Sequence, residues 1–84
     1  MAYVYVLESE KHRKFYIGST ENMGERLARH NQGYEKSTKP YRPYKIAFKQ
    51  KCSNMEEART LEHKIKKWKR RDLILKIIDS GVIY

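Results

Sequence analysis

Two short runs of β-branched and aromatic residues lie near the start of the chain and are separated by a polar segment. Residues 4–7 form the first run and residues 15–17 the second, whereas residues 8–14 are polar. Such runs are typical of strands. Because the connecting segment is short, the pattern predicts an antiparallel hairpin with a longer loop.

A hairpin that is symmetric about residues 10 and 11 defines which side chains share a face. In that register Tyr5 lies opposite Tyr16 and Tyr3 lies opposite Gly18, on the same face of the pleat. Two phenol groups then stand beside a glycine. This arrangement is either an aromatic pair that stabilises a small sheet or the floor of a site, and the hairpin alone does not decide between them.

The next segment predicts a helix that starts near residue 22 or 23. Asn22 and Glu25 have the spacing of an N-terminal capping arrangement, and Gly33 is where the helix should end. Three basic residues share one side of this helix at i, i+3 and i+4: Arg26, Arg29 and His30. They form either a solvated basic face or part of a site.

Residues 33–43 combine glycine, proline, hydroxyl and lysine side chains, which is typical of a loop. Tyr34, Tyr41 and Tyr44 are interleaved with these cations. Exposed aromatic rings among cations suit nucleic-acid stacking and phosphate contact, although tyrosines in such loops also cover cores. Residues 44–51 then alternate loosely around Ile46 and Phe48, which predicts a third strand.

A second helix is predicted to be capped by Ser53, with Glu56 at its third position. An apolar stripe follows at spacings of three, four and three: Ala58, Leu61, Ile65 and Trp68. This stripe should face the core. Glu62 emerges at its edge, where it either pairs with a nearby lysine or serves a site.

The end of the chain is basic and then apolar. Residues 64–71 contain six cations, which we interpret as a basic helix face. Asp72 is predicted to cap a last helix that ends at Gly81. The apolar positions of this helix should bury one side: Leu73, Ile74, Ile77 and Ile78.

The pattern as a whole predicts one α+β domain over residues 1–84, in which helices flank a small three-stranded antiparallel sheet in the order β-β-α-β-α-α. The single cysteine excludes an internal disulfide. No run is long and apolar enough to span a membrane and no secretory signal is visible, so we expect a cytoplasmic protein. The net charge of +9 favours a polyanionic partner, with nucleic acid ahead of an acidic membrane surface.

The motifs taken together resemble the GIY-YIG nuclease superfamily, and in particular its small single-domain members and the Slx-type endonuclease module. Tyr3 stands where the name of the superfamily has glycine. The resemblance covers nearly the whole chain and rests on five features in order: Tyr3-Val4-Tyr5, Tyr16-Ile17-Gly18-Ser19-Thr20, Arg26 with His30 and Asn31, Arg42-Pro43-Tyr44, and Glu56-Glu57-Ala58 up to Glu62.

The resemblance implies a metal-dependent endonuclease that hydrolyses DNA. By similarity Glu62 would hold one divalent ion, Mg²⁺ or Mn²⁺, and Arg26 would bind the scissile phosphate. Tyr5 would take the proton of the attacking water, assisted by Tyr16 and His30. The residues expected to contact nucleic acid are Lys14, Arg29, Tyr34, Lys36, Lys39, Tyr41, Lys66, Lys67, Lys69 and Arg70.

Tyrosine is a weak base, with an ordinary pKa of about 10. We therefore expect that Arg26, Lys14 and the metal lower the pKa of Tyr5, and that activity rises with pH through the neutral range. Two alternatives stay open. One is a nucleic-acid-binding module without turnover, and the other is a component that acts through a protein partner or as a homodimer formed by its C-terminal helix.

Overall fold

The computed structural model describes residues 2–36 and 38–81. It confirms the predicted order of strands and helices, with one additional short 3₁₀ helix, η1. The elements are β1 (Ala2–Ser9), β2 (Phe15–Thr20), α1 (Met23–Gln32), η1 (Lys39–Tyr41), β3 (Tyr44–Cys52), α2 (Met55–Trp68) and α3 (Arg71–Ser80).

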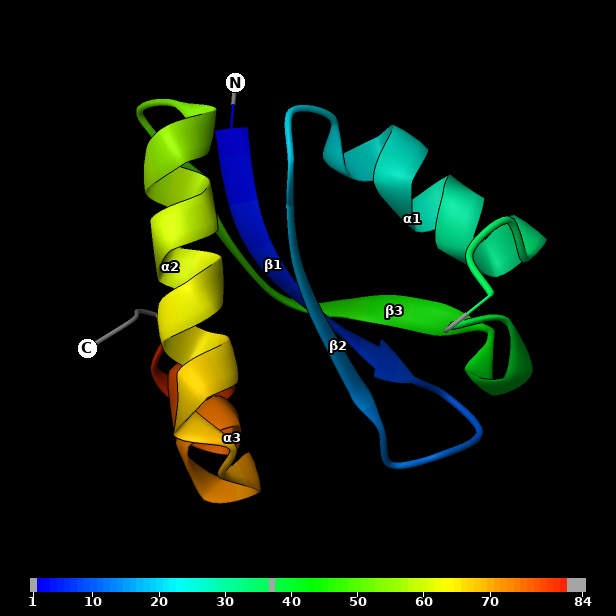
Figure 1. The fold of residues 1–84 in the computed structure, drawn as a ribbon. Coiled ribbons are helices and arrows are strands. Elements are labelled where there is room, and N and C mark those ends of the chain that lie inside the picture. Colours follow the sequence, from blue (N-terminus) through cyan, green and yellow to red (C-terminus); the bar gives the residue numbers. More distant parts are fainter. Residues whose placement is uncertain (1, 37, 82–84) are drawn as a thin grey trace.

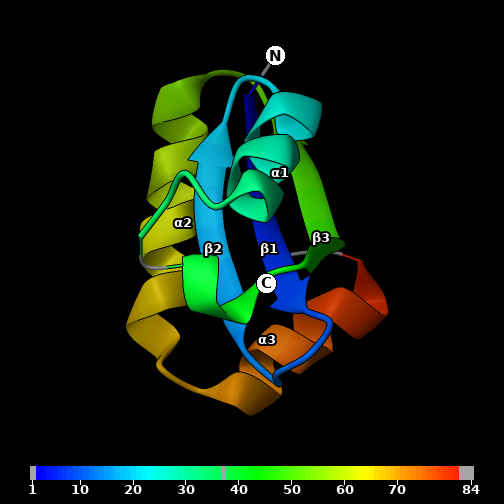
Figure 2. The ribbon, with the colours of Figure 1, turned by 90° about the vertical axis from the view of Figure 1, so that its right-hand side faces the viewer.

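The three strands form one antiparallel sheet in the order β2-β1-β3, so β1 is central. Helix α1 covers one face of the sheet, whereas α2 and α3 lie on the other (Figures 1 and 2). Because both faces of β1 are covered, residues 4–7 are all fully buried. This explains why the run reads as continuously apolar and aromatic.

The hairpin register differs from the prediction by two residues. Tyr5 lies opposite Gly18, and Tyr16 lies opposite Leu7. The strand continues to Ser9, whose hydroxyl accepts a hydrogen bond from the His12 backbone N–H at 3.0 Å and fixes the turn later than expected. A shift of two residues keeps the side chains on the predicted face, but it places Tyr5, rather than Tyr3, over the glycine.

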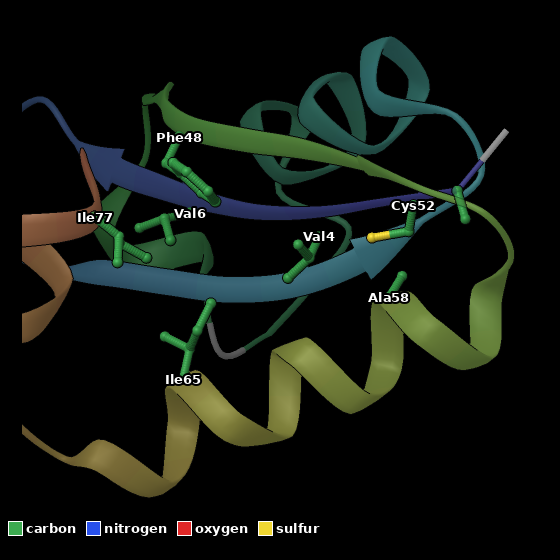
Figure 3. Packing of buried hydrophobic residues seen from close by; sticks show 8 residues of the cluster. Val4, Val6, Phe48, Cys52, Ala58, Ile65 and Ile77 are labelled. Carbon is green, nitrogen blue, oxygen red and sulfur yellow. The ribbon is translucent and has the colours of Figure 1, made fainter. Parts of the chain in front are cut away.

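The two faces of the sheet hold two separate cores. The core beneath α2 and α3 is mainly aliphatic, and Figure 3 shows how its side chains meet between sheet and helices. Its buried members are Ala2, Val4, Val6, Phe48, Cys52, Ala58, Ile65 and Ile77. The core beneath α1 is built from Tyr5, Leu7, Met23 and Tyr44, with Tyr3, Tyr16, Leu27 and Tyr41 packed against it.

Helix α1 begins and ends where the sequence predicts. The Asn22 side chain accepts a hydrogen bond from the Glu25 backbone N–H at 3.0 Å, and Gly33 ends the helix in the left-handed conformation. Helix α2 starts one residue later than predicted, because Asn54 rather than Ser53 is the N-cap and bonds the Glu57 N–H at 2.8 Å.

The prediction that residues 64–71 form one basic helix face is wrong. Helix α2 ends at Trp68, Lys69 adopts a left-handed conformation with φ 48°, and α3 begins at Arg71. Asp72 does not cap α3, because Arg70 occupies the N-cap position without a side-chain cap and Asp72 pairs with its guanidinium at 2.6 Å.

Helix α3 directs its apolar side at this domain's own core. Ile77 is fully buried, and Ile74 and Ile78 pack against the aliphatic cluster. Gly81 ends the helix, as predicted. Among the described residues, no helix has the length and hydropathy needed to cross a membrane.

Candidate active site

The site is centred on the phenol of Tyr5, which crosses the sheet surface to lie over Gly18. Tyr5 is fully buried. A Cβ atom at position 18 would lie 2.6 Å from Tyr5 Cζ and closer still to its hydroxyl. Glycine is therefore needed here for space, because any side chain would displace the phenol.

A chain of hydrogen bonds leads from Tyr5 into the interior. The Tyr5 hydroxyl lies 3.4 Å from His30 Nε2, and His30 Nδ1 lies 2.9 Å from Thr38 Oγ1. The Thr38 hydroxyl donates to the Glu35 carbonyl at 3.3 Å. Because that bond uses the only hydroxyl proton, Thr38 accepts from Nδ1–H, and His30 Nε2 presents its lone pair to Tyr5.

Aromatic rings enclose His30. The ring centroid of Tyr16 lies 4.7 Å from that of His30, the centroid of Tyr44 lies at 6.0 Å, and that of Tyr5 at 6.4 Å. Tyr5 and Tyr16 also contact each other, with centroids 6.4 Å apart. The structure thus confirms that Tyr5 and Tyr16 form an aromatic pair. That the same pair is also the floor of a site stays a prediction.

The basic side of α1 divides into an exposed and a buried part. Arg29 is exposed and pairs with Glu35 at 3.3 Å, whereas His30 is fully buried. Burial lowers the pKa of His30 below its ordinary value; the charge of Glu35 opposes this, while those of Arg26 and Arg29 reinforce it. His30 is therefore neutral at pH 7 and able to accept a proton.

The expected lowering of the Tyr5 pKa is not found. Burial raises the pKa of Tyr5 well above its ordinary value. Arg26 opposes this through its charge and a hydrogen bond, but it does not outweigh desolvation. Lys14 does not help either, because its ammonium lies over the Tyr41 ring, 4.4 Å from the centroid. Tyr5 is consequently protonated throughout the neutral range.

Glu62 lies at the edge of the buried stripe of α2, as predicted, and its side chain is 15% exposed. Ser19 donates a hydrogen bond to Oε1 at 2.6 Å, and Lys66 pairs with Oε2 at 2.6 Å. Burial alone would raise the pKa of Glu62, but the hydrogen bonds from Lys66 and Ser19 together with the charge of Lys66 outweigh it and hold the pKa below its usual range. The carboxylate is therefore ionised.

The donor set around Glu62 suits a hard cation that keeps most of its water. Among the described residues, no three His, Cys, Asp or Glu side chains come together as a metal cage. Mg²⁺ is commonly bound by one or two carboxylates together with waters and substrate phosphates. Glu62 with the Ser19 hydroxyl fits that pattern once the Lys66 ammonium releases Oε2.

Arg26 connects Tyr5 to a cleft between the starts of α1 and α2. The cleft has a volume of about 410 Å³ and is lined by Thr20, Glu21, Asn22, Glu25, Arg26, Arg29, Met55 and Arg59. Sequence reasoning missed Arg59. It lies three residues before Glu62 and seven before Lys66 in α2, a spacing that places all three on one side of a helix and could have identified it.

The remaining residues predicted to contact nucleic acid are spread over the surface. Tyr34 is 70% exposed, and Lys36 and Lys39 lie exposed near it in the chain. Lys67, Lys69 and Arg70 lie at the corner between α2 and α3. The structure therefore places four of the predicted catalytic residues, Tyr5, Tyr16, Arg26 and His30, between the sheet and α1. Glu62 comes from α2 on the other face and meets the edge strand β2 at Ser19. The predicted binding residues are not brought into one surface.

Comparison with known proteins adds to this geometry. The sequence model of the GIY-YIG catalytic domain matches residues 1–75. A UPF0213 protein of Streptococcus pneumoniae is 41% identical over 82% of the chain and 70% of its own length. A UPF0213 protein of Staphylococcus haemolyticus is 36% identical over 93% of the chain and 94% of its own length. A UPF0213 protein of Clostridium perfringens is also 36% identical, over 99% of the chain and 88% of its own length. No solved structure matches significantly.

Proposed function

The chain belongs to the GIY-YIG family, and on this premise we propose that it is a metal-dependent endonuclease that hydrolyses DNA phosphodiester bonds at branched or distorted sites. The observation that carries the proposal is the hydrogen-bonded chain from Tyr5 through His30 to Thr38, with Arg26 and Glu62 both close enough to act on the pKa of Tyr5. The site thus offers a path for a proton from Tyr5 to His30, a cation, Arg26, that can bind phosphate, and a carboxylate, Glu62, that can bind a metal ion.

Tyr5 acts as a relay rather than as an ionised base. Its raised pKa keeps the phenol protonated, so it accepts the proton of the attacking water as it passes its own to His30 Nε2, 3.4 Å away. His30 can receive that proton because it is neutral and its Nδ1–H is held by Thr38. Tyr16, whose ring packs against that of His30 at a tilt of 58°, positions the water or the phosphate.

Arg26 and Glu62 act on the phosphate. The Arg26 guanidinium binds the scissile phosphate and stabilises the negative charge that develops on its oxygens. Glu62, oriented by Ser19, would hold Mg²⁺ or Mn²⁺. When bound, the ion would supply Lewis-acid stabilisation of the phosphate and of the leaving oxygen.

A second candidate is a DNA-binding module without turnover. It is favoured by one observation: both oxygens of Glu62 are engaged by protein groups, Ser19 and Lys66. In this case the net charge of +9 would support binding, and Lys66 would remain on the carboxylate when metal is added.

A cleavage panel separates the two candidates. Branched, nicked and linear DNA are incubated with Mg²⁺ or Mn²⁺ and with the wild-type protein, Arg26→Ala or Glu62→Ala. The endonuclease cuts at least the branched DNA, and each variant abolishes cutting while circular dichroism shows an intact fold. Arg13→Ala and Glu56→Ala, two exposed residues outside the site, are matched controls that should retain cutting. A wild-type protein that shifts DNA on a gel but never cuts it supports the second candidate.

A further inference from the structure

We propose that the cleft between α1 and α2 is a second phosphate subsite, in which Arg59 binds a backbone phosphate next to the one held by Arg26. The inference rests on the proposed nucleic-acid substrate and deepens it, because it names a contact and the path of the strand. Arg59 is the residue on which the subsite depends.

Three arginines line this cleft: Arg26, Arg29 and Arg59. They differ in what else they touch. Arg26 acts on Tyr5, and Arg29 is tied to Glu35 at 3.3 Å. Arg59 is exposed and has no ion pair with any described residue. It is therefore the arginine whose donors are available to a ligand, and a planar guanidinium is suited to binding phosphate through two parallel hydrogen bonds.

The position of the cleft fixes its relation to the reaction. The cleft lies at the end of β2, at Thr20, one residue after Ser19, which holds Glu62. Arg59 lies about one turn before Glu62 on α2. Figure 1 shows the starts of α1 and α2 at the same end of the sheet, opposite the hairpin loop. A strand whose scissile phosphate lies on Arg26 therefore continues toward Arg59.

Two carboxylates in the lining restrict this path. Glu21 and Glu25 also face the cleft, at the start of α1. Their charge repels phosphate, so the strand must pass along the α2 side of the cleft. The volume of about 410 Å³ is enough for a phosphate group and its waters. The mixed charge of the lining thus favours a single localised phosphate contact at Arg59. A uniformly basic surface would instead bind phosphate at many positions.

The test is binding without metal, so that it does not depend on cleavage. Affinity for a branched DNA is measured by fluorescence anisotropy in EDTA over a range of salt concentrations. Arg59→Ala should weaken binding about tenfold and reduce the slope of log affinity against log salt by about 0.7–0.9, the value of one phosphate contact. Arg59→Lys should recover part of the affinity, and Glu25→Gln should strengthen binding.

Arg13→Ala is the matched control, because it removes the same charge from the hairpin loop at the opposite end of the sheet. It should change affinity much less than Arg59→Ala. Equal losses in the two variants would overturn the subsite, since they would show that only overall charge matters. Circular dichroism checks that each variant is folded.

Neutral methylphosphonate linkages then locate the contact. Single substitutions are scanned along the DNA, and the wild-type protein should lose affinity at one position within about two linkages of the scissile phosphate. Arg59→Ala should be insensitive to that substitution while remaining sensitive to the others. If Arg59→Ala keeps the full sensitivity profile, the subsite is wrong. A protein that binds in this way but never cuts would refute the proposed endonuclease and leave the subsite standing.

Discussion

Strand β1 buries side chains on both faces of the sheet, but the two faces differ in kind. Toward α2 and α3 it directs Val4 and Val6 into an aliphatic core. Toward α1 it directs Tyr5 and Leu7 into a core that is rich in phenol groups and contains the buried His30. Alternate residues of one strand therefore serve two different environments.

The two faces satisfy different physical requirements. The aliphatic core gains stability from apolar burial, which is non-directional. The aromatic core must also satisfy each polar group, and among the described residues no buried side-chain nitrogen or oxygen lacks a partner. Burial lowers the pKa of His30, and its hydrogen bond with Thr38 orients the Nε2 lone pair toward Tyr5, so we expect mutations on the two faces to have different consequences.

The largest expected effect comes from removing the Tyr5 hydroxyl. Tyr5→Phe keeps the ring that packs in the aromatic core but ends the proton path, so single-turnover cleavage should fall by about 10²–10⁴-fold, the usual contribution of a positioned proton-transfer group. Tyr3→Phe, on the same strand and face, is the control and should cut like the wild type. Equal rates for Tyr5→Phe and wild type would remove Tyr5 from the mechanism.

A truncation on the other face should affect stability instead. Ile65 is fully buried in the aliphatic core, so Ile65→Ala should lower the free energy of unfolding by about 2–5 kcal/mol, whereas Ile65→Val should lower it by about 0.5–1.5 kcal/mol. Urea denaturation measures both. Cleavage per folded molecule should stay near the wild-type value, and a loss comparable to that of Tyr5→Phe would show that the two faces are coupled.

The glycine beneath Tyr5 joins packing to chemistry. Gly18→Ala places a methyl group against the phenol, and relief of such overpacking typically costs about 1–3 kcal/mol. Stability and cleavage should therefore fall together. Gly24→Ala is a control with the opposite expected effect. Among the described residues, and apart from the adjacent residues and the backbone of α1 itself, the added Cβ meets only Asn22 Oδ1, at 3.8 Å. Alanine should therefore stabilise α1 by up to about 1 kcal/mol. Thermal denaturation compares the two variants, and an increase for Gly18→Ala would contradict the placement of Tyr5.

The sequence predicts the fold more completely than the site, for identifiable reasons. The strands and helices follow from apolar spacing, and Asn22 and Gly33 mark the ends of α1 because capping depends on local residues. The register of the hairpin was missed by two residues, because the Ser9 hydroxyl that extends β1 gave no signal in the hydrophobic pattern.

The electrostatics of the site were harder to predict. The pKa of Tyr5 depends on burial by both neighbouring strands and by α1, which residue types do not reveal. Thr38 was not recognised at all, because it lies in a loop and meets His30 only through the tertiary fold. Arg59 is a different case. Its spacing from Glu62 could be read in the sequence, but the cleft that it lines could be seen only in the structure.

The pH dependence of cleavage tests the relay directly. Tyr5 stays protonated at neutral pH because its pKa is raised, so ionisation of Tyr5 should not appear in the profile. The pKa of His30 lies below its ordinary value of about 6.5. Activity should therefore rise with pH as His30 loses its proton, and level off near neutrality. A rate that keeps rising to about pH 9 would contradict the relay. It would favour ionised Tyr5 as the base, since an ordinary tyrosine has a pKa of about 10.

The smallest expected effect comes from Thr38, whose hydroxyl is hydrogen-bonded to His30 Nδ1 and which we expect to position His30 without contacting the substrate. Thr38→Val preserves the shape of the side chain but removes the acceptor for Nδ1–H. The neutral ring then populates the tautomer that carries its proton on Nε2, and that form cannot accept from Tyr5. Cleavage should fall by up to about tenfold, which is the value of one net hydrogen bond. Nitrogen-15 NMR of the His30 ring should show the proton on Nδ1 in the wild type and a mixture of tautomers in the variant.

Thr38→Ser separates this effect from a loss of packing. Serine keeps the hydroxyl that accepts from Nδ1 and donates to the Glu35 carbonyl, although it removes the methyl group. A purely structural role for Thr38 predicts that serine is no better than valine and that the NMR spectrum of His30 is unchanged in both variants. Recovery of cleavage and of the Nδ1–H signal by serine alone would instead show that the buried hydroxyl, two hydrogen bonds away from Tyr5, sets the direction in which the proton can move.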